Sequence, residues 1–276
     1  MKTLVTSALP YANGPLHLGH LAGVYIPADI YTRHKKLQKE EILHICGSDE
    51  HGVGIIKKAR EAKESYSLYV QKWRDQHKKT FSQWDIIFDH YSQTSSNPLH
   101  AQESQTWFLN LQKKNFIEKS QDLQWQCQDC KEYLPDRFIL GTCYNCGFEK
   151  ARGDECSHCG EWIEASKLLQ PECQFCFSKN LILQEDYQYV LKTSLKHTDL
   201  QEWLTQISTE WRPWIKDYLQ SFYNEPLVSR AISRNLDWGI LVPNEKEKRL
   251  YVWFDAPIGY VTFLKELEKE WSDYKI

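Results

Sequence analysis

The chain has 276 residues, of which 41% are hydrophobic and 26% charged, and a formal net charge of −3. This composition is typical of a globular protein and excludes an intrinsically disordered chain. The small negative charge gives no evidence for a nucleic-acid partner, which would need a local basic patch or a further domain. The N-terminal segment reaches Pro10 before a signal-peptide core could form, and no apolar run approaches membrane-spanning length. We therefore expect a cytoplasmic protein with no membrane partner.

The first third of the chain alternates between strand and helix patterns. Residues 2–8 predict a short strand, and 18–39 predict a helix because apolar side chains recur at spacings of three and four. Residues 41–45 predict a second, buried strand, 54–64 a further helix, and helical patterns continue to about residue 116. Such alternation indicates a parallel sheet with right-handed crossovers. Ligands bind such sheets at the carboxyl ends of the strands, which is where "ALPYANG" (8–14) and "GSDEHG" (47–52) fall.

Eight of the nine cysteines lie in one segment, residues 127–176, as four Cys-x-x-Cys knuckles. Each knuckle lets two thiolates bind one tetrahedral ion, so four knuckles suffice for two closed Cys₄ zinc sites. A closed site leaves no position for water, so such ions would be structural. Free or redox-active thiols are the alternative, but a thioredoxin-like site uses one such motif rather than four. The knuckles are Cys127/Cys130, Cys143/Cys146, Cys156/Cys159 and Cys173/Cys176.

The pairing of the knuckles stays open from spacing alone. A weak repeat between the first two knuckles and the last two favours sequential pairing. Nested pairing instead joins the inner knuckles across residues 147–155 and the outer knuckles across a longer loop. The ninth cysteine, Cys46, ends an apolar run and is expected to be a buried core thiol.

Regular structure is expected again after the cysteines. Residues 185–195 regain a regular pattern, and a Trp-rich segment at 202–223 predicts helices. Residues 249–254 predict a strand, "DAPIGY" (255–260) a turn, and the remainder a helix that runs to the end of the chain. The whole pattern predicts an α/β domain interrupted by a cysteine module.

The segment "PLHLGH" (15–20) follows the first strand and begins the first helix. Helix N-termini attract phosphate because they present unpaired N–H groups and a partial positive charge. His17 and His20 share one helix face and can donate hydrogen bonds to phosphoryl oxygens, while Gly19 permits close approach of a nucleotide. Neither a Gly-x-Gly-x-x-Gly nor a Walker motif is present. Surface or helix-capping histidines, or part of a metal site, are the alternatives.

"ALPYANGPLHLGH" (8–20) resembles the first signature of class I aminoacyl-tRNA synthetases, His-x-Gly-His, in the form met in methionyl-tRNA synthetases. "CGSDEHG" (46–52), "SRNLDWG" (233–239) and "YVWFDAPIGY" (251–260) resemble that family in the same order, and the four knuckles resemble its connective insertion. The resemblance covers essentially the whole chain. It implies a Rossmann-like catalytic domain in two parts, residues 1–116 and 223–276, separated by the connective insertion at 117–222.

The resemblance implies a methionine–tRNA ligase, which activates methionine with ATP and Mg²⁺ and transfers it to tRNA(Met). It places His17 and His20 at the ATP phosphates, with Gly19 beneath the adenosine. Asp49 would supply a counter-charge to the ammonium of methionine, with Arg234 near the adenylate; an ordinary ion pair is the alternative for both. Asp255 would bind the ribose or the amino group. The implied methionine pocket consists of Ala8, Leu9, Tyr11, Asp49, Trp253, Ala256, Pro257 and Tyr260.

The family also implies one or two structural zinc ions with nested pairing. Two expected features of the family are absent from these 276 residues. One is a lysine loop (Lys-Met-Ser-Lys-Ser), which cannot be present because Met1 is the only methionine, and the other is a helical anticodon-binding domain. We therefore expect a fragment or a truncated product, poorly active by itself. The competing hypotheses are a leucyl- or valyl-tRNA synthetase, another nucleotidyltransferase with His-x-Gly-His, and a zinc-ribbon nucleic-acid-binding module.

Overall fold

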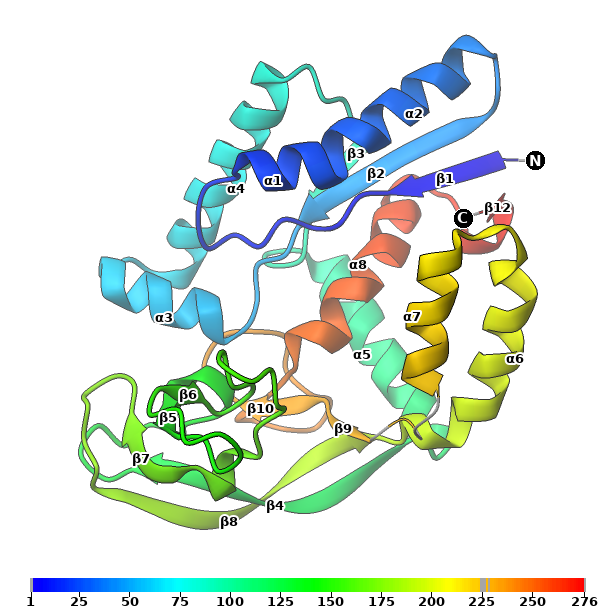
Figure 1. The fold of residues 1–276 in the computed structure, drawn as a ribbon. Helices are drawn as coiled ribbons and strands as arrows, with labels where there is room; N and C mark the ends of the chain where they lie inside the picture. Colours follow the sequence, from blue (N-terminus) through cyan, green and yellow to red (C-terminus); the bar gives the residue numbers. More distant parts are fainter. Residues whose placement is uncertain (1, 224–226, 228, 276) are drawn as a thin grey trace.

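Figure 1 shows a computed structural model of the protein, which describes residues 2–223, 227 and 229–275. Its central element is a parallel sheet in the order β12-β1-β2-β3. The strands are β1 (Lys2–Thr6), β2 (Ile42–Ser48), β3 (His90–Gln93) and β12 (Tyr274–Lys275). The parallel sheet and its helical crossovers confirm the predicted α/β fold.

Helices connect the strands of the parallel sheet. Between β1 and β2 one continuous helical segment contains α1 (Leu18–His20), a π-helical turn (Leu21–Tyr25) and α2 (Ile26–Leu37). Between β2 and β3 lie α3 (Val53–Ala62) and α4 (Tyr66–Gln83), and α5 (Pro98–Lys113) follows β3. Helix α5 starts where it does because the Asn97 side chain accepts the N–H of His100 and proline occupies the first helical position.

Strand β2 is buried on both faces. On one face Ile45 packs with Leu4 and Phe263, and on the other Cys46 packs with Leu21 and Phe81. This two-sided burial explains why residues 42–46 are apolar at every position but His44 rather than at alternate positions. It also confirms the expectation that Cys46 is a core thiol, since its exposed fraction is 0%.

The insertion begins with a long hairpin. Strand β4 (Ile117–Cys127) pairs antiparallel with β8 (Leu181–Leu191) along its whole length, and β9 (Arg230–Ala231) joins β8. A small sheet in the order β6-β5-β7 lies at one end of this hairpin and carries the knuckles. Its strands are β5 (Ile139–Thr142), β6 (Ala151–Arg152) and β7 (Leu169–Cys173). Short 3₁₀ turns occur at Asp136–Phe138, Ala165–Lys167, Thr193–Lys196, Ser208–Glu210 and Trp271–Asp273.

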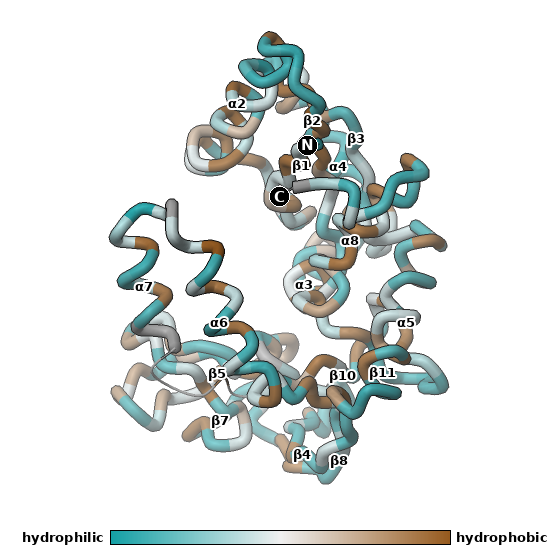
Figure 2. Tube along the Cα trace, turned by 90° about the vertical axis from the view of Figure 1, so that its right-hand side faces the viewer, coloured by the Kyte–Doolittle hydropathy of each residue, from teal (hydrophilic) through white to brown (hydrophobic). Residues whose placement is uncertain are grey.

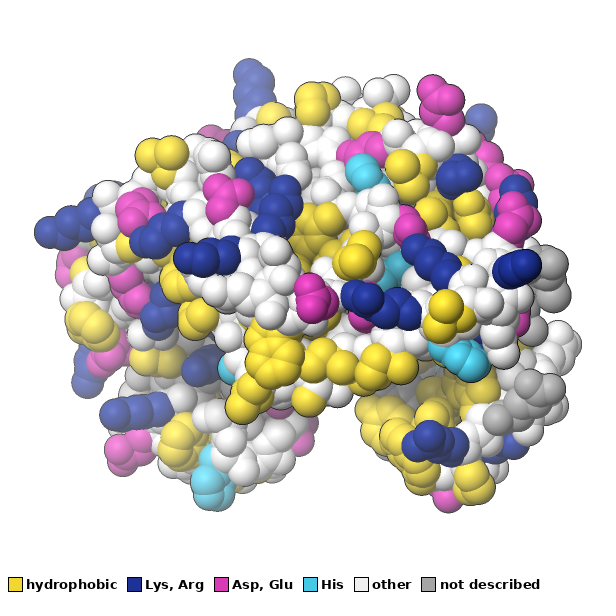
Figure 3. Space-filling view, turned by 90° about the horizontal axis from the view of Figure 1, so that it is seen from above, with side chains coloured by type: hydrophobic (Ala, Val, Ile, Leu, Met, Phe, Trp, Pro, Cys, Tyr) yellow, Lys and Arg dark blue, Asp and Glu magenta, His cyan; other side chains and the backbone are white. Residues whose placement is uncertain are grey.

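Two helices, α6 (His197–Ile207) and α7 (Pro213–Tyr223), form a hairpin that lies, in Figure 1, at the opposite end of β4 and β8 from the small cysteine-rich sheet. In Figure 2 this hairpin stands apart from the parallel sheet. The view from above in Figure 3 shows two lobes projecting at the lower edge, with the surface hollowed between them and hydrophobic side chains gathered there. Among the described residues, every helix is too short or too polar to cross a membrane.

The chain returns to the parallel sheet through β10 (Ser233–Asn235), β11 (Lys248–Leu250) and α8 (Val252–Glu266). Here two predictions are wrong: the strand ends at Leu250, and "DAPIGY" lies inside α8 rather than in a turn. Pro257 lies in the second turn of α8, where its missing N–H costs the helix the backbone bond to the carbonyl of Trp253.

Two further predictions need correction. Residues 90–93 form the edge strand β3, where we expected continued helix, because four residues are too few for a periodic pattern to reveal a strand. The final helix does not run to the end of the chain, since α8 stops at Glu266 and residues 274–275 pair with β1.

Candidate active site and cysteine clusters

The segments that follow β1 and β2 run side by side beyond the carboxyl edge of the sheet. The N–H of Ala12 donates to the carbonyl of Asp49 at 2.8 Å, and the N–H of Asp49 donates to the carbonyl of Pro10 at 3.0 Å. The Tyr11 hydroxyl accepts the N–H of Ile55 at 3.2 Å, at the start of α3. Gly54 has to be glycine here, because a Cβ would lie 2.8 Å from the Tyr11 ring. Residues 8–14 and 49–54 therefore form one continuous edge.

His17 and His20 form a reciprocal cap at the helix N-terminus. Nδ1 of His17 accepts the N–H groups of Gly19 and His20 at 3.1 and 3.4 Å, and Nδ1 of His20 accepts the N–H of His17 at 3.3 Å. Because Nδ1 accepts a backbone N–H in both rings, Nε2 carries the N–H of each ring. The rings are exposed and stack with centroids 3.6 Å apart. Slight burial and then the neighbouring His17 lower the pKa of His20. The pair thus offers two Nε2–H donors on the surface.

Gly19 is needed for this cap. A Cβ at Gly19 would lie 3.0 Å from Cε1 and 3.1 Å from Nδ1 of the His17 ring. Such contacts are tighter than ordinary packing, so a side chain there would displace the imidazole. The sequence suggested that Gly19 leaves space for a nucleotide. The structure shows that Gly19 also leaves space for the His17 ring of the same motif.

Asp255 on α8 is completely buried between two histidines. Its Oδ2 lies 2.7 Å from Nδ1 of His51 and 3.4 Å from Nε2 of His100. Burial alone would raise the pKa of Asp255, but the facing His51 and His100 outweigh burial and lower it. Asp255 is therefore an ionised carboxylate inside the protein.

Asp49 lies within electrostatic reach of Asp255. Burial, and after it the negative charge of Asp255, raise the pKa of Asp49 well above its ordinary value. The Oδ1 atoms of both carboxylates are shielded from solvent and lack a hydrogen-bond partner in the described part of the chain. Two unpartnered carboxylate oxygens with mutual repulsion form an arrangement that a cationic ligand group would stabilise.

The apolar residues assigned to the methionine pocket lie on two elements. Leu9 packs in one cluster with Tyr260, whose hydroxyl donates to the carbonyl of Ser7 at 3.1 Å. The carbonyl of Ala8 accepts the Tyr25 hydroxyl at 3.0 Å. Trp253, Ala256 and Pro257 occupy the first two turns of α8, and the Trp253 side chain is 74% exposed. The structure thus brings Leu9 and Tyr260 together and leaves Trp253 accessible.

Arg234 has a different environment from Asp49. Its Nη1 donates to the carbonyls of Ala231 and Ser233 at 3.0 and 2.8 Å, and its guanidinium lies 4.2 Å from the Tyr251 ring centroid. Arg234 lines a cavity whose described lining includes Trp253 but not Asp49.

Sequence reasoning missed several residues that shape this edge. His51 and His100 flank Asp255, and the indole N–H of Trp238 donates to the carbonyl of Glu50 at 2.7 Å. His51 and Trp238 lie inside the motifs "CGSDEHG" and "SRNLDWG", so the sequence pattern could have identified them. His100 lies outside every quoted motif, and it reaches Asp255 only because α5 packs against α8.

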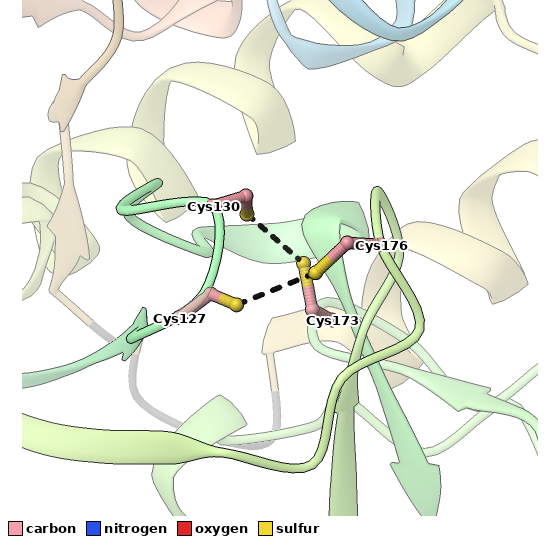
Figure 4. Close-up of side chains that lie close together, drawn as sticks. All are labelled: Cys127, Cys130, Cys173 and Cys176. Carbon is pink, nitrogen blue, oxygen red and sulfur yellow. Dashed lines mark hydrogen bonds between the residues drawn. The ribbon is translucent and has the colours of Figure 1, made fainter.

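The eight knuckle cysteines form two clusters in the nested arrangement. In the outer cluster (Figure 4), Sγ of Cys127 lies 3.5 Å from that of Cys176, and Sγ of Cys130 lies 3.7 Å from that of Cys173. In the inner cluster the Cys143–Cys159 and Cys146–Cys156 separations are 4.0 and 3.6 Å. Tetrahedral Zn–S bonds of about 2.3 Å place sulfur atoms about 3.8 Å apart, so both clusters fit a zinc ion.

Backbone groups prepare one thiol in each cluster for metal binding. The N–H groups of Cys159 and His158 lower the pKa of Cys156 to about 6. Burial opposes ionisation of Cys127, but the N–H groups of Cys130 and Asp129 outweigh it and lower the pKa to about 7. Because the thiolate is the metal-binding form, each cluster contains a thiol that ionises near neutral pH.

The family model described as "tRNA synthetases class I (M)" matches residues 3–275. The chain is 41% identical over 269 residues to the methionine–tRNA ligase of Chloroherpeton thalassium, covering 96% of this chain and 38% of the relative. It is 43% identical over 279 residues to that of Parabacteroides distasonis, covering 99% and 41%. The chain thus spans about two fifths of the length of these relatives.

Solved structures agree with the fold. The chain is similar to Mycobacterium tuberculosis methionyl-tRNA synthetase bound by methionyl-adenylate, with a TM-score of 0.70 and 20% identity over 95% of this chain and 47% of that one. At this identity the likeness supports the Rossmann-like fold alone. Taken with the family model and the sequence relatives, the chain belongs to the class I tRNA synthetase family, in its methionyl (M) branch.

Proposed function

We propose that the protein containing this chain activates methionine with ATP to form methionyl-adenylate and transfers methionine to tRNA(Met). The observation that carries the proposal is that the His17–His20 cap follows β1, and Asp49, which lies near Asp255, follows β2 at the same carboxyl edge of the parallel sheet. Phosphate donors and an ammonium acceptor at one edge are what amino-acid activation requires. Family membership supports the same conclusion.

The capping histidines would bind the phosphates of ATP, which enters together with Mg²⁺. Their Nε2–H groups are fixed as donors by the backbone bonds at Nδ1, so no reorganisation is needed when charge develops. A neutral His20, whose pKa is lowered, keeps this tautomer at neutral pH. Gly19 holds the rings in place and would lie beneath the adenosine.

Methionine would bind with its ammonium at Asp49 and its side chain among Leu9, Tyr260 and Trp253. The unpartnered Oδ1 atoms of Asp49 and Asp255 would accept the ammonium N–H groups. The thioether gains from contact with aromatic rings. The carboxylate of methionine then attacks the α-phosphate and pyrophosphate leaves. No protein nucleophile is needed, because positioning and charge stabilisation supply the rate. The rest of the methionine pocket would be formed by Tyr11, Ala8, Ala256 and Pro257. Arg234 would lie near the adenylate.

The two cysteine clusters would hold one structural zinc ion each. The four-thiol ligand sets leave no open position for a reacting water, so zinc would stabilise the insertion and take no part in the reaction. We also propose the division into residues 1–116, 117–222 and 223–276, and action in the cytoplasm, where tRNA charging supplies translation.

The test is ATP–pyrophosphate exchange by the full-length protein with each amino acid in turn. We expect exchange with methionine well above leucine or valine. A preference for another amino acid would contradict the assignment. The absence of exchange with every amino acid tested would favour the zinc-ribbon binding module.

A further inference from the structure

Glu50 lies between two residues that shape the proposed site, Asp49 and His51, and is itself completely buried. It occupies the irregular segment between the end of β2 and the start of α3, and its exposed fraction is 0%. A buried carboxylate has to be paired or hydrogen-bonded, because the charged form is costly to remove from water. The role of Glu50 therefore has to be found in the groups that surround it.

Each polar group of Glu50 has a partner. Its N–H donates to Oγ1 of Thr94 at 2.9 Å, and its carbonyl accepts the indole N–H of Trp238 at 2.7 Å. Nη1 of Arg74 donates to both carboxylate oxygens, at 2.9 and 3.0 Å, and the Ser95 hydroxyl donates to Oε2. Residues outside regular structure lack the backbone bonds of helices and sheets, so these side-chain bonds hold the segment instead.

The four partners come from three separate parts of the fold. Arg74 is on α4, Thr94 and Ser95 follow β3, and Trp238 follows β10. The segment after β3 is itself joined to β2, since the N–H of Thr94 donates to the carbonyl of Ser48 at 3.0 Å. The backbone and the carboxylate of one residue are thus fixed together, by elements that are packed independently of it.

The Glu50 side chain points away from its two neighbours. Extended backbone places successive side chains on opposite sides, and α4 and α8 cover opposite faces of β2. Nδ1 of His51 contacts Asp255 of α8, whereas the Glu50 carboxylate contacts Arg74 of α4. Anchoring Glu50 on the α4 side therefore fixes the position from which Asp49 and His51 extend toward α8.

The pairing with Arg74 also balances charge close to the site. Burial and then Asp255 raise the pKa of Asp49, and the negative charge of Glu50 adds to this effect. The guanidinium of Arg74 offsets the charge of Glu50 from the α4 side. Removal of either partner would leave a buried charge unpaired, so the segment would have to shift or admit water.

We propose that Glu50 is a positioning residue, which holds the Asp49–His51 segment where Asp49 meets the ammonium group of methionine. The proposal rests on the proposed function and adds to it a residue that acts through its neighbours. Arg74 is its main support, because one nitrogen of Arg74 contacts both carboxylate oxygens. A shift of the segment would misplace the counter-charge and leave the His17–His20 cap in place. Methionine binding should therefore suffer, and ATP binding should not.

The test is steady-state pyrophosphate exchange by the full-length protein and three variants. Glu50→Gln keeps the shape of the side chain but loses its charge, and Arg74→Met removes the charged donor. Arg74→Lys retains one charged nitrogen, which is all that Arg74 presents to Glu50.

We expect the KM for methionine to rise about tenfold in Glu50→Gln and Arg74→Met, and to stay within about threefold of the wild-type value in Arg74→Lys. The kcat and the KM for ATP should stay near their wild-type values, because the ammonium contact is the same in the ground state and the transition state. A merely structural role would not separate the two KM values in this way.

Asp29→Asn is the matched control. Asp29 on α2 is likewise a buried carboxylate, 7% exposed, which is paired with Arg33 and accepts the N–H of Ile87 at 3.0 Å. It lies outside the segment that carries Asp49. We expect Asp29→Asn to lower the stability measured by thermal denaturation and to leave both KM values unchanged.

Ser95→Ala keeps the proposal testable if the charge variants fail to fold. It removes one donor to Glu50 and leaves the ion pair with Arg74 intact. The KM for methionine should then rise about threefold, as for the loss of one hydrogen bond, with an unchanged KM for ATP.

A wild-type KM for methionine in Glu50→Gln, Arg74→Met and Ser95→Ala would overturn the inference. Equal rises in the two KM values, or equal KM values for methionine in Arg74→Lys and Arg74→Met, would overturn it as well. Absence of methionine-dependent exchange in the wild-type protein would refute the proposed function. Normal wild-type exchange with unchanged variants would refute the positioning role of Glu50 alone.

Discussion

At the scale of single residues, Gly19 constrains the His17 ring directly. We expect Gly19→Ala to displace the imidazole, because a Cβ would lie 3.0 Å from Cε1 of His17. Methionine-dependent pyrophosphate exchange should fall about 10²-fold, as for the loss of one preorganised donor. The free energy of unfolding should fall by only about 0.5–2 kcal/mol, as for a lost helix cap.

A second glycine in the same helical segment provides the control for that experiment. A Cβ at Gly23 would have no neighbour within 4 Å, so Gly23→Ala should leave exchange near the wild-type value and raise the free energy of unfolding by about 0.5–1 kcal/mol, as expected for alanine in place of glycine in a helix. Equal exchange rates for Gly19→Ala and Gly23→Ala would show that the His17 ring position does not matter for activation.

Asp49 offers a test that separates binding from stability. Asp49→Asn removes a carboxylate whose pKa is raised by burial and by Asp255, so the folded state loses a repulsion. We therefore expect stability to be retained or increased, while the KM for methionine rises about 10²-fold through loss of the ammonium counter-charge. The KM for ATP should change little. An unchanged KM for methionine would exclude Asp49 from ammonium binding.

At the scale of elements, the sequence predicted the parts that depend on long patterns and missed those that depend on packing. The first strand, the helix that begins at the histidines and the buried second strand follow from periodicity and run length. "DAPIGY" was assigned to a turn because Pro257 and Gly259 usually interrupt helices. In the structure Gly259 permits close packing, since a Cβ there would lie 3.3 Å from Phe263 and 3.4 Å from Leu9. Tertiary contacts thus overrode local propensity in α8.

Knuckle pairing shows the same limit. Spacing permitted sequential and nested pairing, and only the antiparallel hairpin β4–β8 decides between them. That hairpin pairs Cys127 with Leu181, so it brings the first and the last knuckles together. The site was predictable to the extent that its residues lie in contiguous motifs. The contact of His51 with Asp255 spans 204 residues and could be found only in the fold.

Replacement of Cys143 should affect one cluster alone. Because the inner cluster shares no ligand with the outer one, Cys143→Ser should release one zinc ion per chain and leave the other. A structural Cys₄ site couples about 10–16 kcal/mol of metal binding to local folding, so residues 139–163 should lose protection from amide exchange. Metal analysis gives the count. Loss of both ions, or of neither, would contradict independent nested sites.

The outer cluster is held against α3 by Arg60. Its guanidinium donates to Tyr66 at 2.9 Å, to Glu132 at 2.9 Å and to Asp237 at 3.0 Å. It also lies 4.9 Å from the centroid of the Phe175 ring, beside the fourth knuckle. One side chain thus joins α3, the first and last knuckles and the turn before Trp238.

Removal of this guanidinium should loosen the insertion without releasing zinc. We expect Arg60→Met to lower the free energy of unfolding by about 1–2 kcal/mol, since its partners are partly exposed. Amide exchange should increase in the knuckles and at residues 237–239, with two zinc ions retained. Lys58→Met, on the same helix and paired only with Glu61 in the described residues, should change neither measurement.

At the scale of the whole molecule, the proposed site depends on segments from both ends of the chain. Residues 8–20 and 49–54 come from the first part, whereas Asp255 and Trp253 come from α8, after the chain has passed through the entire insertion. Helix α8 packs against both β2 and α5, which fixes Asp255 between His51 and His100. Stability of this arrangement is therefore a prerequisite for the site, and buried titratable groups make that stability dependent on pH.

Two buried histidines determine the direction of that dependence. Burial lowers the pKa of His44 despite the raising influence of the Ile87 carbonyl and of Asp29 and Asp89, and burial, together with His20, lowers the pKa of His77. Both rings are thus neutral when folded and become protonated more readily when unfolded. The unfolded state binds more protons below the ordinary histidine pKa of about 6.5, so their stabilising effect is present above that pH and lost as pH falls. The lowered pKa of Asp255 also makes the folded state less stable as pH falls, but at still lower pH. The raised pKa of Asp49 has the opposite effect, because the folded state then binds the extra proton.

We therefore expect the free energy of unfolding, measured by urea denaturation, to decrease from pH 7.5 to pH 5.5. Each histidine contributes at most about 1.4 kcal/mol per pH unit below its unfolded pKa. His77→Gln retains a donor for the Gly14 carbonyl, which lies 2.8 Å from Nε2 of His77, but glutamine cannot titrate. The slope of the free energy of unfolding against pH should therefore fall by up to the contribution of one histidine, about 1.4 kcal/mol per pH unit. His34→Gln, at an exposed position of α2, should keep the wild-type slope. If His77→Gln and the wild-type protein lose stability equally between these two pH values, the acid sensitivity of the fold does not arise from His77.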